Sequence, residues 1–296
     1  MTEFLQQLLN GLSLGAIYAL IALGYTMVYG VLRFINFAHS DVFMVGAFIG
    51  YYTAQHVPMD TLGGGGLVLL AAMAGCAILG IVIERCVYRP LRGGPTLNVL
   101  ITAIGVSLLL EYTGQLVFGA SPRTFPAVFP HREFVWGGLT VSSNEVLVIA
   151  VAGALLAALQ AIVYRTKIGM AMRALALNPQ AASLVGVNND AVISFTFGLG
   201  SALAAAGGVL YALNYPSIDP LMGVMPGLKA FIAAVLGGIG SIPGAALGGL
   251  LLGTVETFVA GSALSTWKDA IAFAVLILIL LSRPAGLLGK YRTEKV

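Results

Sequence analysis

FLQQLLNGLSLGAIYALIALGYTMVYGVL, residues 4–32, contains no charged residue. A helix needs roughly 20 predominantly apolar residues to cross the hydrocarbon core of a bilayer, so this stretch is long enough to span a membrane. Equally uncharged runs follow at 93–110, 146–164, 191–218 and 230–255. The pattern predicts a polytopic membrane protein. Its spans are expected to be helices, because a transmembrane β-barrel would show alternating strands of about ten residues instead.

The apolar segments set the expected number of spans. They lie at 8–30, 42–56, 66–83, 97–118, 145–164, 191–214, 228–241, 243–260 and 266–282. Two of them are short, 42–56 and the glycine-rich 228–241. Each short segment either crosses at a tilt or forms part of a broken or re-entrant helix. We therefore expect an all-α polytopic integral membrane protein with eight or nine transmembrane or partly re-entrant helices. The side of the N-terminus depends on 42–56.

Positive charge is concentrated in three short clusters. Glu84–Arg92, Arg165–Asp190 and Arg283–Lys295 together hold 10 of the 15 Lys and Arg residues but only 3 of the 12 Asp and Glu residues. Short cytoplasmic loops collect Lys and Arg, so the clusters predict the cytoplasmic side and place the C-terminus there. Two crossings separate the first two clusters, which places 119–144 outside. Asp219 and Lys229 are expected to flank a second external connector.

Composition excludes several classes of protein. At 58% hydrophobic and 9% charged residues, with a mean hydropathy of +0.95, little of the chain can form a soluble catalytic domain. The net charge of +3 reflects the bias of the cytoplasmic loops and does not indicate a nucleic-acid surface. Cys76 and Cys86 have no nearby histidines and suit neither a disulfide nor a metal site. The first apolar segment lacks a basic leader and is expected to be an uncleaved span.

The sequence motifs also give little support to catalysis. The chain contains no G-x-x-x-x-G-K-[ST] pattern, so it cannot bind ATP in the P-loop manner, and any energy must come from another protein. H-E-x-x-H is missing, and the G-x-S-x-G match at residues 11–15 (GLSLG) lies inside the first apolar run and not at a strand-to-helix turn, so an intramembrane hydrolase has little support. We therefore expect no catalytic residue, no cofactor and no metal.

The strongest functional signal is RTKIGMAMRALALNPQAASLVGVNND, residues 165–190, which is long for a loop between spans. Ile168–Leu177 has helical propensity, and Asn178 is a natural N-cap for a second helix over Pro179–Val185. Gly186 is a plausible residue to end it. Two short amphipathic helices on the cytoplasmic face favour a docking surface for another protein. The alternative is an interfacial connector without a partner.

Polar residues also occur at membrane depth. Asn36, His39 and Asp41 lie between two apolar spans, flanked by Phe34 and Phe37. Such groups are costly in lipid and usually face a cavity, a partner or another polar group. They either line a pathway or gate, or form a hydrogen-bonded break that ties two helices together. His39 has no companions that would make it a metal ligand or general base.

Two carboxylates lie inside apolar segments, Glu111 in 97–118 and Glu256 in 243–260. An intramembrane acid is a candidate for a functional site. Each could equally lie in the headgroup zone or pair with a base on a neighbouring helix. The translocation-pathway candidates are therefore Asn36, His39, Asp41, Glu111 and Glu256.

Longer motifs connect these features to a known family. GAIYAL (15–20), GYTMVYG (24–30) and INFAH (35–39) closely resemble the N-terminal signature of the branched-chain amino acid permeases, H-type membrane subunit. LGGIGSIPGA (236–245) resembles the later glycine-rich signature of that family. Q-A-A-x-x-x-G (180–186) is similar to the E-A-A-x-x-x-G loop by which permeases of ATP-binding-cassette (ABC) importers engage their ATPases, with Gln180 in place of the usual acid. The resemblance covers essentially the whole chain.

The resemblance carries expectations of its own. It implies that 1–296 is one transmembrane permease domain in the bacterial inner membrane, with 165–190 as its cytoplasmic ATPase-coupling loop. It implies a second homologous permease subunit, two cytoplasmic ATPases, a periplasmic substrate-binding protein and lipid as partners, and leucine, isoleucine and valine as cargo. Ser40 departs from the glycine common in the family, without a functional consequence that we can assign. The coupling candidates are Gly169, Arg173, Gln180, Ala181, Ala182 and Gly186.

Two other functions compete with this interpretation. A permease of the same family could carry urea, short amides or other amino acids instead, since specificity in such systems lies largely with the binding protein. An ion-coupled secondary transporter would require a carboxylate near the bilayer midplane and no docking loop. Here the loop is present and the carboxylates lie off centre, which favours the ABC importer.

Overall fold

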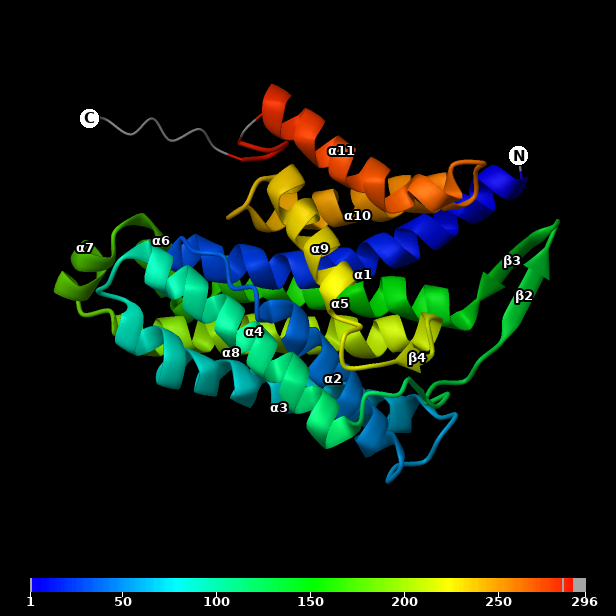
Figure 1. Ribbon diagram of the computed structural model, residues 1–296, viewed down its shortest axis with the longest axis horizontal. Helices are drawn as coiled ribbons and strands as arrows, with labels where there is room; N and C mark the ends of the chain where they lie inside the picture. The colour runs from blue at the N-terminus through cyan, green and yellow to red at the C-terminus, as the bar shows by residue number, and fades with distance from the viewer. Residues whose placement is uncertain (1, 284, 290–296) are drawn as a thin grey trace.

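The computed structural model describes residues 2–283 and 285–289. Within these residues, nine apolar helices correspond to the nine expected segments (Figure 1). They are α1 (Thr2–Leu32), α2 (His39–Ala54), α3 (Leu62–Ile83), α4 (Thr96–Phe118), α5 (Ser143–Arg165), α8 (Asn189–Asn214), α9 (Val224–Gly237), α10 (Ile242–Ala260) and α11 (Lys268–Ser282). Seven described helical stretches are long and apolar enough to cross a membrane, and the last of them is the 18-residue Ser265–Ser282, which contains α11. The 16-residue α2 and the 14-residue α9 fall short of that length, so eight or nine full crossings are not confirmed.

Short elements connect these helices. They are η1 (Glu84–Tyr88), η2 (Arg89–Leu91), β1 (Arg123–Thr124), β2 (Glu133–Trp136), β3 (Leu139–Ser142), α6 (Lys167–Leu177), α7 (Pro179–Leu184), β4 (Ser217–Ile218) and η3 (Ser265–Trp267). The all-α expectation therefore needs a small correction, because β1 pairs with β4 and β2 pairs with β3, both antiparallel. Gly137 and Gly138 have φ values of +57° and +86°, which suits them to the tight turn of the β2–β3 hairpin.

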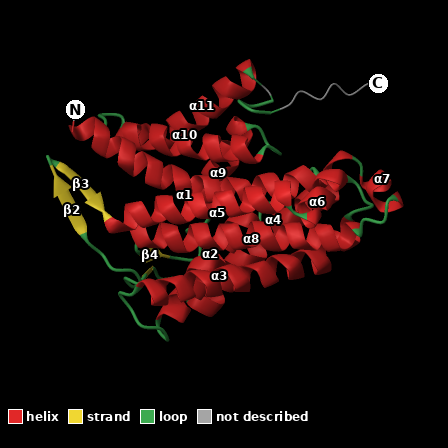
Figure 2. Ribbon diagram, turned by 180° about the vertical axis from the view of Figure 1, so that it is seen from behind, coloured by secondary structure: helices red, strands yellow, loops and turns green. Residues whose placement is uncertain are grey.

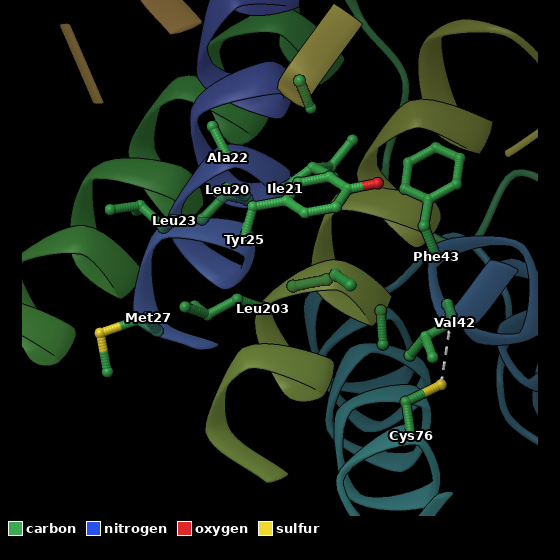
Figure 3. Packing of buried hydrophobic residues seen from close by; sticks show 14 of the residues in the cluster. Leu20, Ile21, Ala22, Leu23, Tyr25, Met27, Val42, Phe43, Cys76 and Leu203 are labelled. Carbon is green, nitrogen blue, oxygen red and sulfur yellow. Dashed lines mark hydrogen bonds between the residues drawn. The ribbon is translucent and has the colours of Figure 1, made fainter. Parts of the chain in front are cut away.

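Two long helices form the centre of the bundle. The most apolar window of α1 is 94% buried and that of α8 is 89% buried, whereas the corresponding window of α11 is only 6% buried. α1 and α8 run antiparallel, since Gly24 lies against Gly200 while Asn214 Nδ2 donates to Ser13 Oγ (3.0 Å). Figure 3 shows the apolar packing around Tyr25, with Cys76 Sγ of α3 pointing at the carbonyl oxygen of Val42 (3.5 Å).

Glycines allow the closest helix contact. Gly11 and Gly15 of α1 lie directly on the backbone of α10, and a Cβ added at Gly15 would lie 2.7 Å from Leu250 Cα. Small residues let helix backbones approach in lipid, where burying apolar side chains gains little. The Gly11/Gly15 and Gly249/Gly253 pairs are therefore packing positions within this one bundle.

The structure contains an inverted repeat. The order long helix, short helix, two further helices occurs in α1–α2–α3–α4 and again in α8–α9–α10–α11. The packing repeats too. In the first comparison, α1 packs on α9 and α10, and α8 packs on α2 and α3 in the same way. In the second, α2 contacts α4, and α9 contacts α11. Because α1 and α8 are antiparallel, the two halves have opposite orientations. α5 lies outside this repeat, which the sequence alone did not reveal.

The bundle has two distinct ends (Figures 1 and 2). The α6–α7 end carries those two helices and the beginnings of α4 and α8, and the hairpin end carries β2 and β3. Gln6 of α1 exchanges hydrogen bonds with Thr140 of β3 (2.8 and 2.9 Å), so the described start of α1 lies at the hairpin end. Of the third charge cluster, Lys290, Arg292 and Lys295 lie outside the described residues, and the predicted side of the C-terminus stays a prediction.

Candidate coupling surface and buried polar clusters

The predicted pair of short helices is present at 165–190. Thr166 Oγ1 caps α6 by accepting from Gly169 N (3.1 Å). Asn178 Oδ1 caps α7 by accepting from the backbone N–H groups of Gln180 (2.9 Å) and Ala181 (3.0 Å). Pro179 is the first residue of α7, as predicted, and the helix ends one residue before the expected Val185. Gly186 has a φ of +87°, the left-handed conformation that ends a helix and favours glycine.

The six coupling candidates divide into two groups. Gly169 packs against the backbone of Ile162 and Val163 of α5, where a Cβ would overlap, and Ala182 is buried. These two residues hold α6 and α7 on the bundle. The other candidates are exposed, namely Arg173, Gln180, Ala181 and Gly186. Arg173 also lies over the ring of Tyr164, with the guanidinium carbon 5.3 Å from the ring centroid.

Three apolar residues extend this exposed group. Leu177, Leu184 and Val185 are 65%, 87% and 78% exposed, although their side chains are large and apolar. The sequence analysis did not single them out. Their position at the ends of the two predicted helices, away from the buried Met172 and Leu175, was the signal that could have found them. We define the docking surface as Arg173, Leu177, Gln180, Ala181, Leu184, Val185 and Gly186.

A network of ion pairs lies beside this surface. Arg92 bonds the carboxylates of both Glu84 and Asp190, and Arg89 also bonds Asp190. Ser194 Oγ donates to the second oxygen of Glu84, whose side chain is fully buried. Burial lowers the pKa of Arg92, which still has two acidic partners to favour its charged form. The sequence analysis used Arg89 and Arg92 only as markers of sidedness.

The first three pathway candidates lie together at the start of α2. Asn36 is in the non-helical segment 33–38 and accepts from the Tyr88 hydroxyl at 2.6 Å. The His39 ring is buried against Tyr25, with ring centroids 4.7 Å apart. Asp41 is 1% exposed and accepts from Ser107 Oγ of α4 at 2.5 Å. These contacts are those of a hydrogen-bonded break between helices, and a role in the pathway stays a prediction.

The two remaining candidates lie elsewhere. Glu111 is half-buried on α4, four residues after Ser107. Glu256 is buried and accepts from Lys229 Nζ at 2.5 Å and from the Tyr18 hydroxyl at 2.9 Å. Pairing with a base on a neighbouring helix, one alternative for Glu256, is what the structure shows. Lys229 does not flank an external connector as expected, because it is a buried residue of α9 that also contacts Asp269 at 2.7 Å.

Two cavities are associated with these features. One of about 580 Å³ lies at the α6–α7 end, and its lining includes Arg33, Arg92, Asn178, Gln180 and Asp190. The other, of about 260 Å³, lies at the hairpin end between α1, α5 and α8, with a lining that includes Asn10, Asn144 and Asn214. Among the described residues, no three His, Cys, Asp or Glu side chains come together as a metal site would require.

Cysteine labelling can test the sidedness of the two ends. In a background lacking Cys76 and Cys86, we expect a cysteine at Leu184, which is 87% exposed, to react only from the cytoplasm. A cysteine at the exposed Arg132 should react only from outside. Met172 is 3% exposed and unsuitable for labelling. If the Leu184 cysteine reacts from outside, the predicted orientation of the protein in the membrane is wrong.

Comparison with known proteins points to one family. Residues 7–280 match the family described as "Branched-chain amino acid transport system / permease component". The high-affinity branched-chain amino acid transport system permease protein BraD of Pseudomonas aeruginosa is 44% identical, covering 99% of this chain and 98% of that protein. LivH of Escherichia coli K12, which has the same description, is 41% identical with the same coverage.

More distant similarities are also found. A probable branched-chain amino acid transport permease, LivH of Methanocaldococcus jannaschii, is 25% identical and covers 91% of this chain and 88% of that protein. Among solved structures, PsaBC from Streptococcus pneumoniae in complex with Fab aligns with a TM-score of 0.49 and 12% identity, covering 94% of this chain and 91% of that chain. The family assignment rests on the sequence relatives.

Proposed function

Because this chain belongs to the family of branched-chain amino acid transport permeases, we propose that it is the membrane-spanning subunit of an ABC importer that carries leucine, isoleucine and valine across the bacterial inner membrane. A periplasmic binding protein delivers the amino acid, and a second homologous permease completes the membrane part. Two cytoplasmic ATPases supply the energy, and this subunit is not itself an enzyme. The observation that carries the proposal is the docking surface on α6 and α7.

The docking surface has the chemistry of a protein contact. Three large apolar side chains are exposed beside Arg173 and Gln180, an arrangement that costs free energy in water unless a partner covers it. Asn178 and Gly186 fix the two ends of α7, so the surface is presented in one conformation. A preorganised surface of this kind loses little conformational entropy on binding. It therefore suits the transmission of movement from an ATPase.

The positive charges indicate how the chain lies in the membrane. Arg89, Arg92, Arg165 and Lys167 belong to elements of the α6–α7 end, and short loops rich in Lys and Arg face the cytoplasm. We place the hairpin end, with the described start of α1, in the periplasm. The nine helices then alternate in direction, with α2 and α9 as short crossings completed by the non-helical segments 33–38 and 215–223, and the C-terminus is cytoplasmic.

An uptake assay tests both the function and the cargo. Vesicles that contain this chain with its ATPases, its second permease and the binding protein should accumulate leucine only with ATP. Isoleucine and valine should compete, whereas urea and short amides should not. Accumulation by the chain alone, or accumulation driven by an ion gradient, would refute an ABC importer. Competition by urea or short amides would show that the chain is a permease of the same family with a different cargo.

The binding protein is expected to set the order of preference among the three amino acids. Asp41→Asn keeps the shape of the buried side chain next to Ser107 but removes its charge. We expect this variant to change the uptake rate while the ranking of leucine, isoleucine and valine stays the same, because we assign the choice among them to the binding protein. The control is Ser107→Ala, which removes the same hydrogen bond from the α4 side. A reordered ranking would show that the permease itself selects cargo.

A further inference from the structure

The docking surface is connected to the interior of the bundle by a series of polar contacts, which the chain itself links at 189–190 and through η1. The first contacts join α7 to the beginning of α8. Asn189 Nδ2 donates to the carbonyl oxygen of Pro179 at 2.9 Å, and Val187 N donates to that of Ala182 at 3.1 Å. These bonds link the first residue of α7 and a residue of its last turn to the chain that enters α8. A shift of α7 therefore has to move Asn189 and its neighbour Asp190.

The next contacts cross from α8 to the end of α3. Asp190 accepts from Arg92 Nη1 at 2.7 Å, and the other terminal nitrogen of Arg92 bonds Glu84. The Arg92 side chain is 18% exposed and that of Glu84 is fully buried, so the bond between them is shielded from water and from screening by salt. Asp190, at the outer end, is 45% exposed. One guanidinium group thus bridges a residue of α8 and a residue of η1, because its terminal nitrogens can each bind a different carboxylate.

The last contact reaches the break before α2. Glu84 and Tyr88 begin and end the single π-helical turn η1, a local distortion that is frequent at functional sites. The Tyr88 hydroxyl donates to Asn36 Oδ1, and its ring is fully buried between Phe34 and Phe197, with centroid separations of 5.1 and 5.4 Å. Asn36 lies in the segment 33–38, where Arg33 adopts a left-handed φ of +56°.

We propose that Asp190, Arg92, Glu84 and Tyr88 are positioning residues that transmit movement of α7 to the 33–38 break between α1 and α2. This inference rests on the proposed function, since it assigns to the ATPase the movement that enters the series. The break is the place where such movement can open or close the bundle, because residues 34–38 are not helical and their backbone N–H groups donate no backbone hydrogen bond in the described structure. We call these four residues the relay.

Transport stoichiometry in the complete transporter tests the relay. Arg92→Gln would leave Glu84 buried without its partner and could prevent folding, so milder changes are needed. Tyr88→Phe keeps the ring and removes only the hydroxyl, and Asp190→Asn alters a residue whose side chain is 45% exposed. We expect each to lower the amino acid transported per ATP hydrolysed about fivefold. The double variant should lower it no further, because both changes interrupt the same series.

Matched variants separate the relay from a general loss of structure. Tyr52→Phe removes a hydroxyl that bonds Arg123 near the hairpin end, and it should leave the stoichiometry unchanged. Arg89→Gln removes the more exposed partner of Asp190 and should also have little effect. A purely structural role would reduce the amount of folded transporter, and then uptake and hydrolysis would fall together.

The outcomes also separate the relay from the docking proposal. Unchanged stoichiometry in both single variants would overturn the relay, and so would effects that multiply in the double variant. If Gly186→Leu still uncouples hydrolysis from uptake in that case, ATPase docking at α7 stands and only the relay fails. If Gly186→Leu remains fully coupled, the docking proposal itself is wrong.

Discussion

Gly186→Leu is expected to reduce uptake about 5- to 30-fold while the protein still inserts into the membrane. Gly186 has a φ of +87°, and a side chain in the left-handed region costs roughly 1–2 kcal/mol, which corresponds to that factor. Apart from the two chain neighbours, no described residue has an atom within 4 Å of the position of an added Cβ, so the change does not disturb the described core. It alters the end of α7 and the shape of the docking surface. In the assembled transporter, ATP hydrolysis should continue while amino acid uptake falls.

Two other substitutions serve as controls. Gly186→Asn should retain most of the activity, because asparagine adopts the left-handed conformation more readily than leucine. Gly93→Leu introduces the same side chain at the same end of the bundle, at a glycine with ordinary φ and free space around it, and should be nearly neutral. If Gly186→Leu retains full uptake coupled to ATP hydrolysis, α7 does not take part in coupling.

The sequence predicted the helices well because the constraint on them is simple. A backbone in lipid must satisfy its own hydrogen bonds, so each long apolar run becomes a helix, and all nine expected segments are helical. Asn178, Pro179 and Gly186 act locally, which is why the boundaries of α7 were predictable to within one residue. The role of 165–190 as a coupling loop remains a proposal.

The parts that could not be predicted depend on contacts between distant residues. Lys229 lies near two prolines in the sequence, and only the packing of α9 on α10 shows that its partner is Glu256. The relay joins Asn36, Tyr88 and Asp190 across three separate segments. The inverted repeat is a relation between helix packings and leaves no obvious trace in the residues. Periodicity and composition carry no information about such pairings.

Lys229→Met is expected to have the largest effect on stability. The side chains of Lys229 and Glu256 are each 6% exposed, and Lys229 Nζ lies 2.5 Å from Glu256 Oε1. Removing one member of a buried ion pair typically costs about 3–5 kcal/mol, because the other charge is left without a partner in a medium of low polarity. The short helix α9 would also lose its ionic contacts with α10 and α11. Less folded protein and a markedly lower Tm in detergent should result.

The double variant Lys229→Met/Glu256→Gln tests the cause of that loss. It removes both charges, and the amide oxygen can still accept from Tyr18, so we expect it to recover much of the lost Tm. Asp269→Asn, at a side chain that is 42% exposed, should have little effect. The Lys229–Glu256 pair also bears on the transport mechanism. In an ion-coupled transporter the carboxylate must bind and release the coupling ion, whereas Glu256 is bound to the fixed cation of Lys229. A Lys229→Met protein as stable as the unaltered one would mean that the ion pair does not hold α9 on α10. Glu256 would then no longer count as a residue fixed by a cation, and the ion-coupled transporter would regain support.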